Sequence, residues 1–561
     1  MQKLAFNHNW DFQPDHSEFR WGQPPLTNWR KVDLPHDWSV EYDRSPDNPS
    51  RASNGYFIMG KGLYRKTFSA PEEWQNKRVF VEFEGVYMNA EVCINGHFLG
   101  LHPYGYTPFH YDLSPFLKYG SDENELFVLV DNSHQLNSRW YSGSGIYRPV
   151  WLCVENPVHL AWWGVAVTTP EIEPERALVR AQTTVANESG GDQTVTVRTR
   201  ILAADGAVIA QDEISGAVQM MAQAVFSQEL VVEPPRLWSP DEPNLYHLET
   251  DLLIDGRLMD IEITPFGIRK IEYSAKEGFR LNGQPLLMKG GCVHHDNGVL
   301  GAASYPRSEE RKVEVLKASG FNAIRCAHNP PAPAFLDACD RLGMLVIDEA
   351  FDCWREGKTS GDYHTVFDCW WQNDLETMVY RDRNHPSVVV WSIGNELVER
   401  MKPEGAVIGR RLADTIRAID PTRPVTAAVQ FAYGSEKWED ADGLFAVLDI
   451  CGYNYNWKQY AEDSQKHPER IIFGTESFPK EAFENWMEVL EKPNVIGDFV
   501  WTSLDYLGEA GIGRVLLDDE KGNFLGAYPW HQAYCGDLDL CGFKRPQSYY
   551  RDILWNCGEK L

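Results

Sequence analysis

Two glutamates, Glu396 and Glu476, each follow a short apolar segment of the kind that forms a buried parallel strand. Residues 388–393 (VVVWSI) are too short and too rich in β-branched side chains for a helix, and they end in Gly-Asn-Glu. Residues 471–475 (IIFGT) lead in the same way to Glu476. Hydrolysis of a glycosidic bond requires one carboxyl that donates a proton and a second that attacks as a nucleophile. Taken alone, Glu396 is better explained as a helix cap or the partner of a surface arginine, and Glu476 could also be a cap.

The C-terminal half of the sequence contains elements that could bring these two glutamates together. From about residue 275 onward, short apolar segments alternate with amphipathic helices, for example over residues 308–319 and 403–419. Strands are expected at residues 286–290, 321–326, 344–348, 388–393, 425–429, 448–453, 471–475 and 495–501. Eight strands and their helices in about 290 residues predict a (β/α)8 TIM barrel. Glu396 would then follow strand four and Glu476 strand seven, at the mouth where barrel active sites lie.

Residues 1–155 have the alternating pattern of an all-β domain. Asn95-Gly96 separates two alternating segments and is a hairpin signal, because both residues tolerate positive φ. Repeated short strands with Gly and Pro turns predict a jelly-roll β-sandwich. The clearest examples of the alternation are residues 79–84, 90–94 and 126–130.

Residues 156–268 predict a second all-β domain, an immunoglobulin-like β-sandwich. Period-two alternation continues through this region without a helical stretch, most clearly over residues 178–186, 194–202 and 246–254. Its composition suggests no chemistry, so we expect it to be a spacer that positions the first domain against the third. The barrel would occupy residues 269–561.

Residues 384–396 (NHPSVVVWSIGNE) closely resemble the acid/base signature of glycoside hydrolase family 2, the family of β-galactosidases, β-glucuronidases and β-mannosidases. The resemblance implies that Glu396 is the acid/base and Glu476 the nucleophile of a retaining mechanism, which needs carboxyls about 5–5.5 Å apart. The Gly-rich loop 142–146 could either reach the active site or simply close its domain. The first domain resembles the sugar-binding domain of the same family at residues 34–38 (LPHDW), 62–68 (GLYRKTF) and 142–152 (SGSGIYRPVWL).

The same resemblance implies roles for five further residues, each of which could instead be a packing residue. Asn395 would hydrogen-bond the sugar 2-OH or the nucleophile. Tyr455, in CGYNY, would hydrogen-bond the nucleophile and keep it ionised. Arg325 and His328, both in IRCAHNP, would pair with the nucleophile and reach the sugar, respectively. Trp501, in DFVWTSLDY, would be the aromatic platform beneath the glycone.

The strings WYSGSGIYR, VHHDNG, DEAFD and FVWTSLDYLGE most resemble the bacterial β-galactosidase branch, so we expect a retaining exo-β-galactosidase. Glucuronidases of the family hold the sugar carboxylate with an Asn-x-Lys motif after strand eight. Here that loop, residues 508–526, lacks the motif and carries Asp518, Asp519 and Glu520, while the matching letters at 456–458 follow strand six. The alternatives are a β-glucuronidase or another exo-glycosidase such as a β-glucosidase. A non-catalytic carbohydrate-binding protein is disfavoured because both glutamates are present.

No metal and no other cofactor is expected. Some large β-galactosidases of the family bind magnesium through a Glu and a His that follow the strand-three motif. Here DEA at 348–350 continues into Phe-Asp-Cys-Trp, so that pair is missing. Asp348 and Glu349 are expected to be structural.

The composition limits which binding partners and which cellular compartment are expected. Lys and Arg number 53 against 81 Asp and Glu, and the net charge of −28 argues against nucleic acid or an anionic membrane as a partner. The expected partner is a small oligosaccharide or glycoside, and a homo-oligomer stays open. The N-terminus lacks the pattern of a signal peptide, and eleven cysteines show no paired spacing, which predicts a cytoplasmic protein. We also expect the chain to lack the C-terminal β domains of longer relatives.

Overall fold

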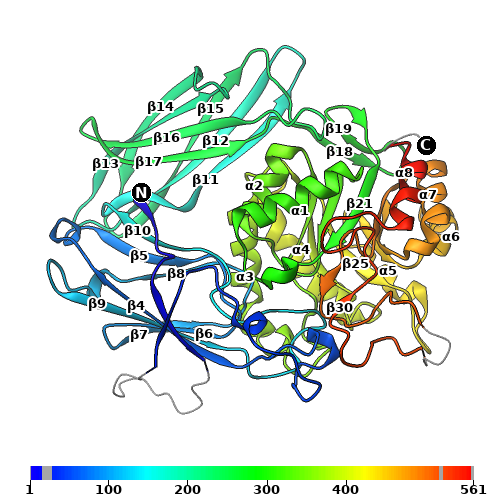
Figure 1. The fold of residues 1–561 in the computed structure, drawn as a ribbon. Helices are drawn as coiled ribbons and strands as arrows, with labels where there is room; N and C mark the ends of the chain where they lie inside the picture. Colours follow the sequence, from blue (N-terminus) through cyan, green and yellow to red (C-terminus); the bar gives the residue numbers. More distant parts are fainter. Residues whose placement is uncertain (1, 15–27, 517–521, 558–561) are drawn as a thin grey trace.

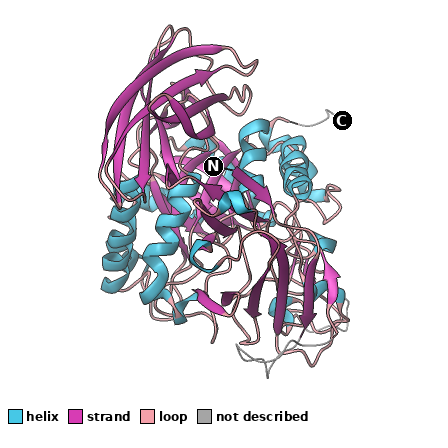
Figure 2. Cartoon of the chain, turned by 90° about the vertical axis from the view of Figure 1, so that its left-hand side faces the viewer, coloured by secondary structure: helices cyan, strands magenta, loops and turns pink. Residues whose placement is uncertain are grey.

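The computed structural model describes residues 2–14, 28–516 and 522–557, which form three units packed side by side (Figure 1). Two units are built from strands, and the third combines a barrel of strands with an outer layer of helices (Figure 2). The predicted fold class, a jelly-roll sandwich, an immunoglobulin-like sandwich and a TIM barrel, is confirmed. Among the described residues, no helix is long and apolar enough to cross a membrane.

The first unit is a sandwich of two antiparallel sheets. One sheet has the order β1 (Gln2–Ala5), β10 (Val150–Glu155), β5 (Arg78–Phe83) and β8 (Phe109–Asp112). The other has the order β3 (Arg30–Val32), β2 (Trp10–Pro14), β4 (Lys61–Ser69), β9 (Glu123–Asp131), β6 (Ala90–Ile94) and β7 (His97–His102). Asn95 and Gly96 join β6 to β7 with φ values of 49° and 84°, as the hairpin signal predicts.

The second unit is also a sandwich. Alternate residues of its strands point into a shared core. On β12, for example, Val179 and Ala181 are buried, whereas Arg180 and Gln182 are exposed. One sheet contains β11 (Val158–Ile172), β12 (Ala177–Asn187) and β15 (Ala222–Val232), and the other contains β14 (Val208–Val218), β13 (Gln193–Leu202), β16 (Tyr246–Ile254) and β17 (Arg257–Phe266).

A small sheet of β18 (Ile271–Ser274), β19 (Gly278–Leu281) and β20 (Gln284–Pro285) leads into a closed parallel barrel. The barrel strands are β21 (Met288–Val293), β22 (Ala323–Cys326), β23 (Leu345–Glu349), β24 (Val388–Asn395), β25 (Val425–Gln430), β26 (Cys451–Asn454), β27 (Ile472–Ser477) and β28 (Val495–Val500). The helices are α1 (Pro306–Ala318), α2 (Pro333–Leu342), α3 (Phe367–Asp382), α4 (Pro403–Ile419), α5 (Asp442–Phe445), α6 (Tyr460–Lys466), α7 (Ala482–Glu491) and α8 (Pro546–Trp555). Beyond β28, β29 (Tyr506–Leu507) pairs with β30 (Gln532–Ala533).

Five barrel strands begin one to three residues later than the sequence pattern predicts, and the structure explains two of these shifts. Strand one was expected from residue 286, but the backbone N–H of Leu286 donates to Phe279 in the preceding small sheet, so the barrel strand starts at Met288. Strand six was expected from residue 448, but Leu448 closes a turn onto Phe445 and the strand starts at Cys451. In both cases the apolar run extends beyond the barrel strand. Before strand one it continues into residues that bond to the small sheet, and before strand six it continues into a turn.

The first sandwich is fixed against the mouth of the barrel by hydrogen bonds between distant parts of the chain. The Tyr104 hydroxyl donates to the Ala350 carbonyl at 2.6 Å, just beyond β23. Arg148 donates to the Pro330 carbonyl at 2.9 Å, beyond β22. These contacts hold the loop between β7 and β8, and the segment that follows β9, over the carboxyl ends of the barrel strands.

Candidate active site

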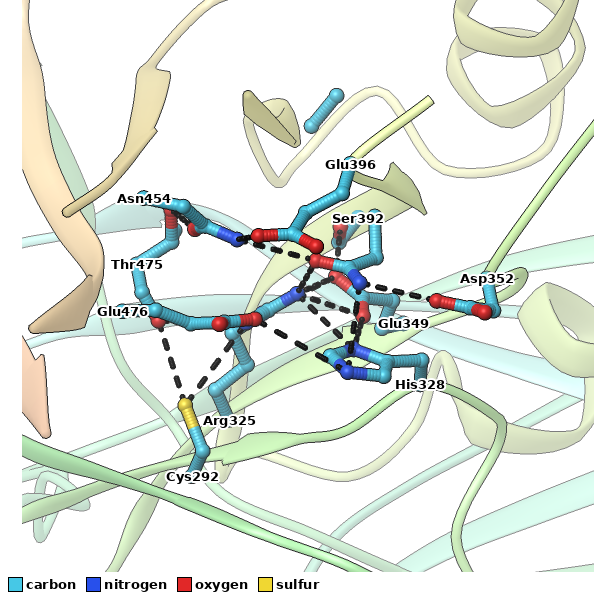
Figure 3. A network of polar contacts seen from close by, with 12 residues as sticks. Cys292, Arg325, His328, Glu349, Asp352, Ser392, Glu396, Asn454, Thr475 and Glu476 are labelled. Carbon is cyan, nitrogen blue, oxygen red and sulfur yellow. Dashed lines mark hydrogen bonds and ion pairs between the residues drawn. The ribbon is translucent and has the colours of Figure 1, made fainter. Parts of the chain in front are cut away.

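Glu396 and Glu476 both lie at the mouth of the barrel, Glu396 after β24 and Glu476 on β27. Glu396 follows β24 directly, and its backbone, at a φ of 41°, is held by an N–H bond of 2.8 Å to the Ala428 carbonyl of β25. Glu476 lies within β27, and its carbonyl accepts the Tyr455 N–H at 2.6 Å. Figure 3 shows both carboxyl groups extending into the same space above Arg325.

Arg325, on β22, is the cation at the centre of the site. Its side chain is fully buried and donates to Glu476 Oε1 at 2.9 Å and to both oxygens of Glu349 at 2.8 Å. A buried arginine is stable only where carboxylates neutralise it, so it fixes the positions of both. The predicted pairing of Arg325 with Glu476 is therefore present in the structure.

Glu349 holds Arg325 and His328 in place. Its carboxylate accepts the Ser392 hydroxyl at 2.7 Å and lies 2.9 Å from His328 Nδ1, in addition to its bonds with Arg325 (Figure 3). The sequence suggested a purely structural residue at this position. Because Glu349 orients two predicted site residues, it is better described as a positioning residue.

Asn395 connects Arg325 to the side of the site that carries Glu396. Its Oδ1 accepts from Arg325 at 2.9 Å and from Asn454 Nδ2 at 3.2 Å. The same Asn454 Nδ2 lies 3.2 Å from Glu396 Oε1. The Nδ2 of Asn395 donates to Asp352 at 2.9 Å and lies 3.3 Å from His328 Nε2. Four bonds thus fix the amide and leave it little rotational freedom.

The first domain contributes Arg139 to this site. Its guanidinium donates to Asp352 Oδ1 at 2.8 Å, and its other amino group lies 3.8 Å from Glu396 Oε2. Lys358 also donates to Asp352, at 2.7 Å. Burial opposes ionisation of Asp352, but Arg139 and Lys358 hold its pKa well below the usual range. The nearby loop 142–146 reaches the barrel as well, since His295 hydrogen-bonds the Ser142 carbonyl at 3.2 Å.

The charges around Glu476 oppose one another. Burial and the negative charge of Glu396 raise the pKa of Glu476 to about 7, while Arg325 and a hydrogen bond from Tyr455 act in the other direction. The Glu476 carboxyl therefore ionises only near neutral pH, and Arg325 and Tyr455 stabilise its anion.

Tyr455 follows β26 and is half-buried, with its ring stacked on Phe478 at 4.3 Å. Burial and the charges of Glu476 and Glu396 raise the pKa of its hydroxyl well above the usual range. The hydroxyl therefore keeps its proton and remains a donor to Glu476, the role that the family resemblance implies.

Aromatic rings form one side of the site. Trp501 lies parallel to the His328 ring, with centroids 5.2 Å apart and planes 1° apart, and is 8 % exposed. Trp140 stacks on His294 at 5.1 Å. A cavity of 340 Å³ between the first domain and the barrel borders Trp140, His328 and Asp352. The wall is thus shared between two domains, and Trp501 has only a narrow surface available to a ligand.

A third carboxyl, Glu509, lies in the loop after β28. Its side chain accepts the Tyr506 hydroxyl, and its N–H donates to the Ser53 carbonyl of the first domain at 2.8 Å. Burial raises its pKa, while Arg139 acts in the opposite direction. The acidic residues expected further along this loop, Asp518 to Glu520, lie outside the described residues.

The structure brings all seven predicted site residues together. Hydrogen bonds or ion pairs connect Arg325, Asn395, Glu476, Tyr455 and His328; Glu396 joins through Asn454, and Trp501 through its contact with His328. Sequence reasoning did not identify His294, Arg139, Asp352, Asn454 or Glu509. The strings VHHDNG and DEAFD gave a usable signal for His294 and Asp352, because both follow barrel strands. For Arg139 the sequence offered only the Gly-rich loop 142–146 that follows it, because its contact depends on how two domains dock.

Within residues 2–14, 28–516 and 522–557, no group of three or more His, Cys, Asp or Glu is arranged to hold a metal ion. The absence of a cofactor stays a prediction from the sequence.

Comparison with known families covers nearly the whole chain. Residues 4–156 match the model for the glycosyl hydrolases family 2 sugar binding domain, residues 158–269 the model for glycosyl hydrolases family 2, and residues 274–525 the model for the family 2 TIM barrel domain.

Individual relatives give the same picture. Beta-galactosidase BoGH2A from Bacteroides ovatus is 38% identical over 639 residues, covering 100% of this chain and 73% of the relative. A putative beta-glucuronidase from Formosa agariphila is 33% identical, covering 98% of this chain and 55% of that protein.

Solved structures agree on the fold. A glycosyl hydrolase family 2 member from Bacteroides cellulosilyticus superposes with a TM-score of 0.94 at 43% identity, over 99% of this chain and 71% of that one. A beta-glycosidase from Bacteroides vulgatus gives a TM-score of 0.86 at 31% identity, over 99% of this chain and 75% of its own.

Proposed function

Because the chain belongs to glycosyl hydrolases family 2, we propose that it is a retaining exo-β-glycosidase that removes terminal β-galactose from small glycosides. The observation that supports this proposal best is the pair Glu396 and Glu476, which face one site and of which Arg325 contacts Glu476. This asymmetry suits one carboxyl to hold a proton and the other to attack.

In the first step, the Glu396 carboxyl transfers its proton to the glycosidic oxygen as the carboxylate of Glu476 attacks the anomeric carbon. The carbon–oxygen bond to the aglycone breaks, the aglycone leaves as an alcohol, and a covalent ester to Glu476 forms. Arg325 and Tyr455 hold the attacking oxygens in place before this step. Asn395, fixed by four bonds, is available to orient the sugar.

In the second step, Glu396 is an anion beside a neutral ester. It accepts a proton from a water molecule, whose oxygen attacks the anomeric carbon and releases Glu476. Two inversions at the same carbon give net retention. Glu396 ends protonated and Glu476 ends as a carboxylate, so the starting state is restored.

The choice of a neutral glycone rests on the charges around the site. A buried sugar carboxylate needs a compensating cation. Arg325, Arg139 and Lys358, the cations beside the two glutamates, each contact a carboxylate of the protein already. Lys458, in the only sequence match to the glucuronidase motif, is exposed and lies over the Trp457 ring. These pairings favour galactose or glucose over glucuronate.

Galactose is preferred to glucose because a relative at 38% identity carries the name beta-galactosidase. Other relatives are named beta-glucuronidase, which keeps that activity as the main alternative. Specificity constants for matched aryl β-galactoside, β-glucoside and β-glucuronide decide the matter. We expect the galactoside to give the highest kcat/KM. A glucuronide constant equal to or above it would overturn the choice, and a glucoside preference would change only the sugar.

We also propose a reducing compartment, the cytoplasm. All eleven cysteines lie in the described residues and are free, and seven of them are buried, which is typical of proteins kept reduced. A homo-oligomer remains a prediction that light scattering on the purified protein would test.

A further inference from the structure

A cavity of 560 Å³ lies away from the candidate active site, where the outer faces of the two sandwiches meet. β5, β8 and β10 line one side, and β11, β12 and β15 line the other. Tyr380 and Arg383, at the end of α3, line it from the barrel side. None of its lining residues belongs to the network around the catalytic glutamates. Its volume falls within the range of about 300–1,000 Å³ that is usual for small-molecule sites.

Strand alternation explains why this cavity is polar. On β5, Val79 and Val81 point into the core of the first sandwich, so Glu82 points outward. On β10, Cys153 and Glu155 point outward in the same way. An outward face normally meets solvent. Here the second sandwich covers it, and all three outward residues are at most 8 % exposed.

A distortion of β11 brings two tryptophans into the cavity. The pairing of β11 with β12 is interrupted across residues 161–164, where Trp162 and Trp163 stack on each other at 3.9 Å. Trp163 has a φ of 51°, a strained value for a bulky residue. Arg383 donates to its carbonyl at 2.8 Å, and a Cβ on Gly164 would lie 2.6 Å from the Ala161 carbonyl oxygen. The surrounding structure therefore holds the two rings in a defined position.

Hydrogen-bonding groups stand beside these rings. The His110 ring lies perpendicular to Trp162 at 3.7 Å, and its Nδ1 is buried without a hydrogen-bond partner. Burial lowers the pKa of His110 to about 4, so the imidazole is neutral and can bond a hydroxyl. On the opposite sheet, the amides of Gln182 and Gln223 line the cavity.

The carboxylates of the cavity are already paired, which argues against a cationic ligand. Glu82 accepts Lys3 at 2.8 Å, and Arg78 forms an ion pair with Glu188. The carboxyl of Glu155 lies 3.3 Å from His159 Nε2. What remains is a pair of aromatic rings with neutral donors and acceptors beside them, which is the surface that sugar rings require.

We propose that this cavity is a carbohydrate-binding site for a short neutral oligosaccharide, separate from the catalytic pair and contributed jointly by the two sandwiches. It goes beyond the proposed function, because it does not depend on which sugar the barrel cleaves. A site there would hold one part of a glycan while the barrel acts elsewhere.

Isothermal titration calorimetry tests this with cellotriose, xylotriose and galactotriose, in a Glu476→Gln background that prevents hydrolysis. We expect at least one trisaccharide to bind at millimolar concentration or below. Trp162→Ala should weaken that binding at least tenfold. Gln182→Trp should do the same by filling the cavity from an exposed position without removing any packed side chain. Gln211→Trp, an exposed strand position of the same domain outside the cavity, is the matched control and should bind like the parent.

Kinetic measurements on the same variants distinguish this site from the active site. With both catalytic glutamates intact, Trp162→Ala and Gln182→Trp should hydrolyse an aryl glycoside with kcat/KM within twofold of the wild-type value. Three results would overturn the proposal: no trisaccharide binding, binding that Gln182→Trp leaves unchanged, or binding of choline in place of sugars. Failure of the proposed function would show instead in the aryl glycoside panel, which does not involve this cavity.

Discussion

Arg325 Nη1 lies 2.9 Å from Glu476 Oε1, and both side chains are almost completely shielded from solvent. The same guanidinium binds Glu349 through its other nitrogens. One cation thus holds two buried carboxylates from different strands, and Glu476 owes its position to a residue 151 positions earlier in the chain.

Replacement of Arg325 with Gln should impair both folding stability and catalysis. It leaves two buried carboxylates without their cation, which should lower the free energy of unfolding by about 3–5 kcal/mol. We expect a lower free energy of unfolding in urea and a kcat/KM reduced about 100-fold or more. Arg325→Lys keeps the charge but loses the forked geometry, so it should recover stability better than activity. Unchanged kcat/KM in either variant would contradict this role.

Replacement of Glu396 with Gln should make the rate depend on the leaving group. Aglycones that need a proton should react about 10²–10⁴-fold more slowly, whereas a dinitrophenyl glycoside, which needs none, should keep its first step. Added azide should then give a glycosyl azide of retained configuration, detectable by NMR. Normal hydrolysis of lactose by this variant would remove Glu396 from the mechanism.

A 2-deoxy-2-fluoro-β-galactoside with an activated aglycone should label Glu476. The fluorine destabilises the positively charged transition state and slows the second step more than the activated first step, so the ester accumulates. Mass spectrometry of peptides should locate one added sugar on the peptide that contains Glu476. A label on another carboxyl would show that the nucleophile has been misassigned.

The pH dependence of kcat/KM should reflect the ionisation of Glu476. The pKa of Glu476 is raised to about 7, so with a dinitrophenyl glycoside, whose first step needs no proton donor, kcat/KM should rise about tenfold per pH unit below pH 7 and level off above it. In Glu396→Gln the neighbouring negative charge is gone, so the pKa of Glu476 should fall and this rise should move to lower pH. A rise that stays at the same pH would mean that another group titrates.

The apolar segments in the sequence correctly located the strands that carry Glu396 and Glu476. Residues 388–393 are buried on both faces of a parallel strand, so their apolar run marks the strand and Glu396 marks its end. The same logic misplaced the start of strand one, because the N–H of the apolar Leu286 bonds to the small preceding sheet and not to a barrel strand.

Contacts between domains could not be predicted in this way. Arg139 and Asp352 are 213 positions apart and meet only because the first sandwich docks on the barrel mouth. No local periodicity encodes that docking. The motif around residue 139 indicated a loop of interest, but only the structure shows which of its side chains reaches Glu396.

Arg139 therefore gives a test of whether the first domain takes part in catalysis. Its guanidinium lies 2.8 Å from Asp352 and 3.8 Å from Glu396, so Arg139→Met removes a positive charge from the proton-donor side while Lys358 still neutralises Asp352. We expect kcat/KM to fall about 10–100-fold, because oriented charges in such sites typically contribute this much or more. Thermal stability should change little. Arg180→Met is the matched control, since it breaks an exposed pair with Glu229 in the second domain and should leave kcat/KM unchanged. Equal kinetics for the two variants would show that the first domain supports the barrel without acting on the reaction.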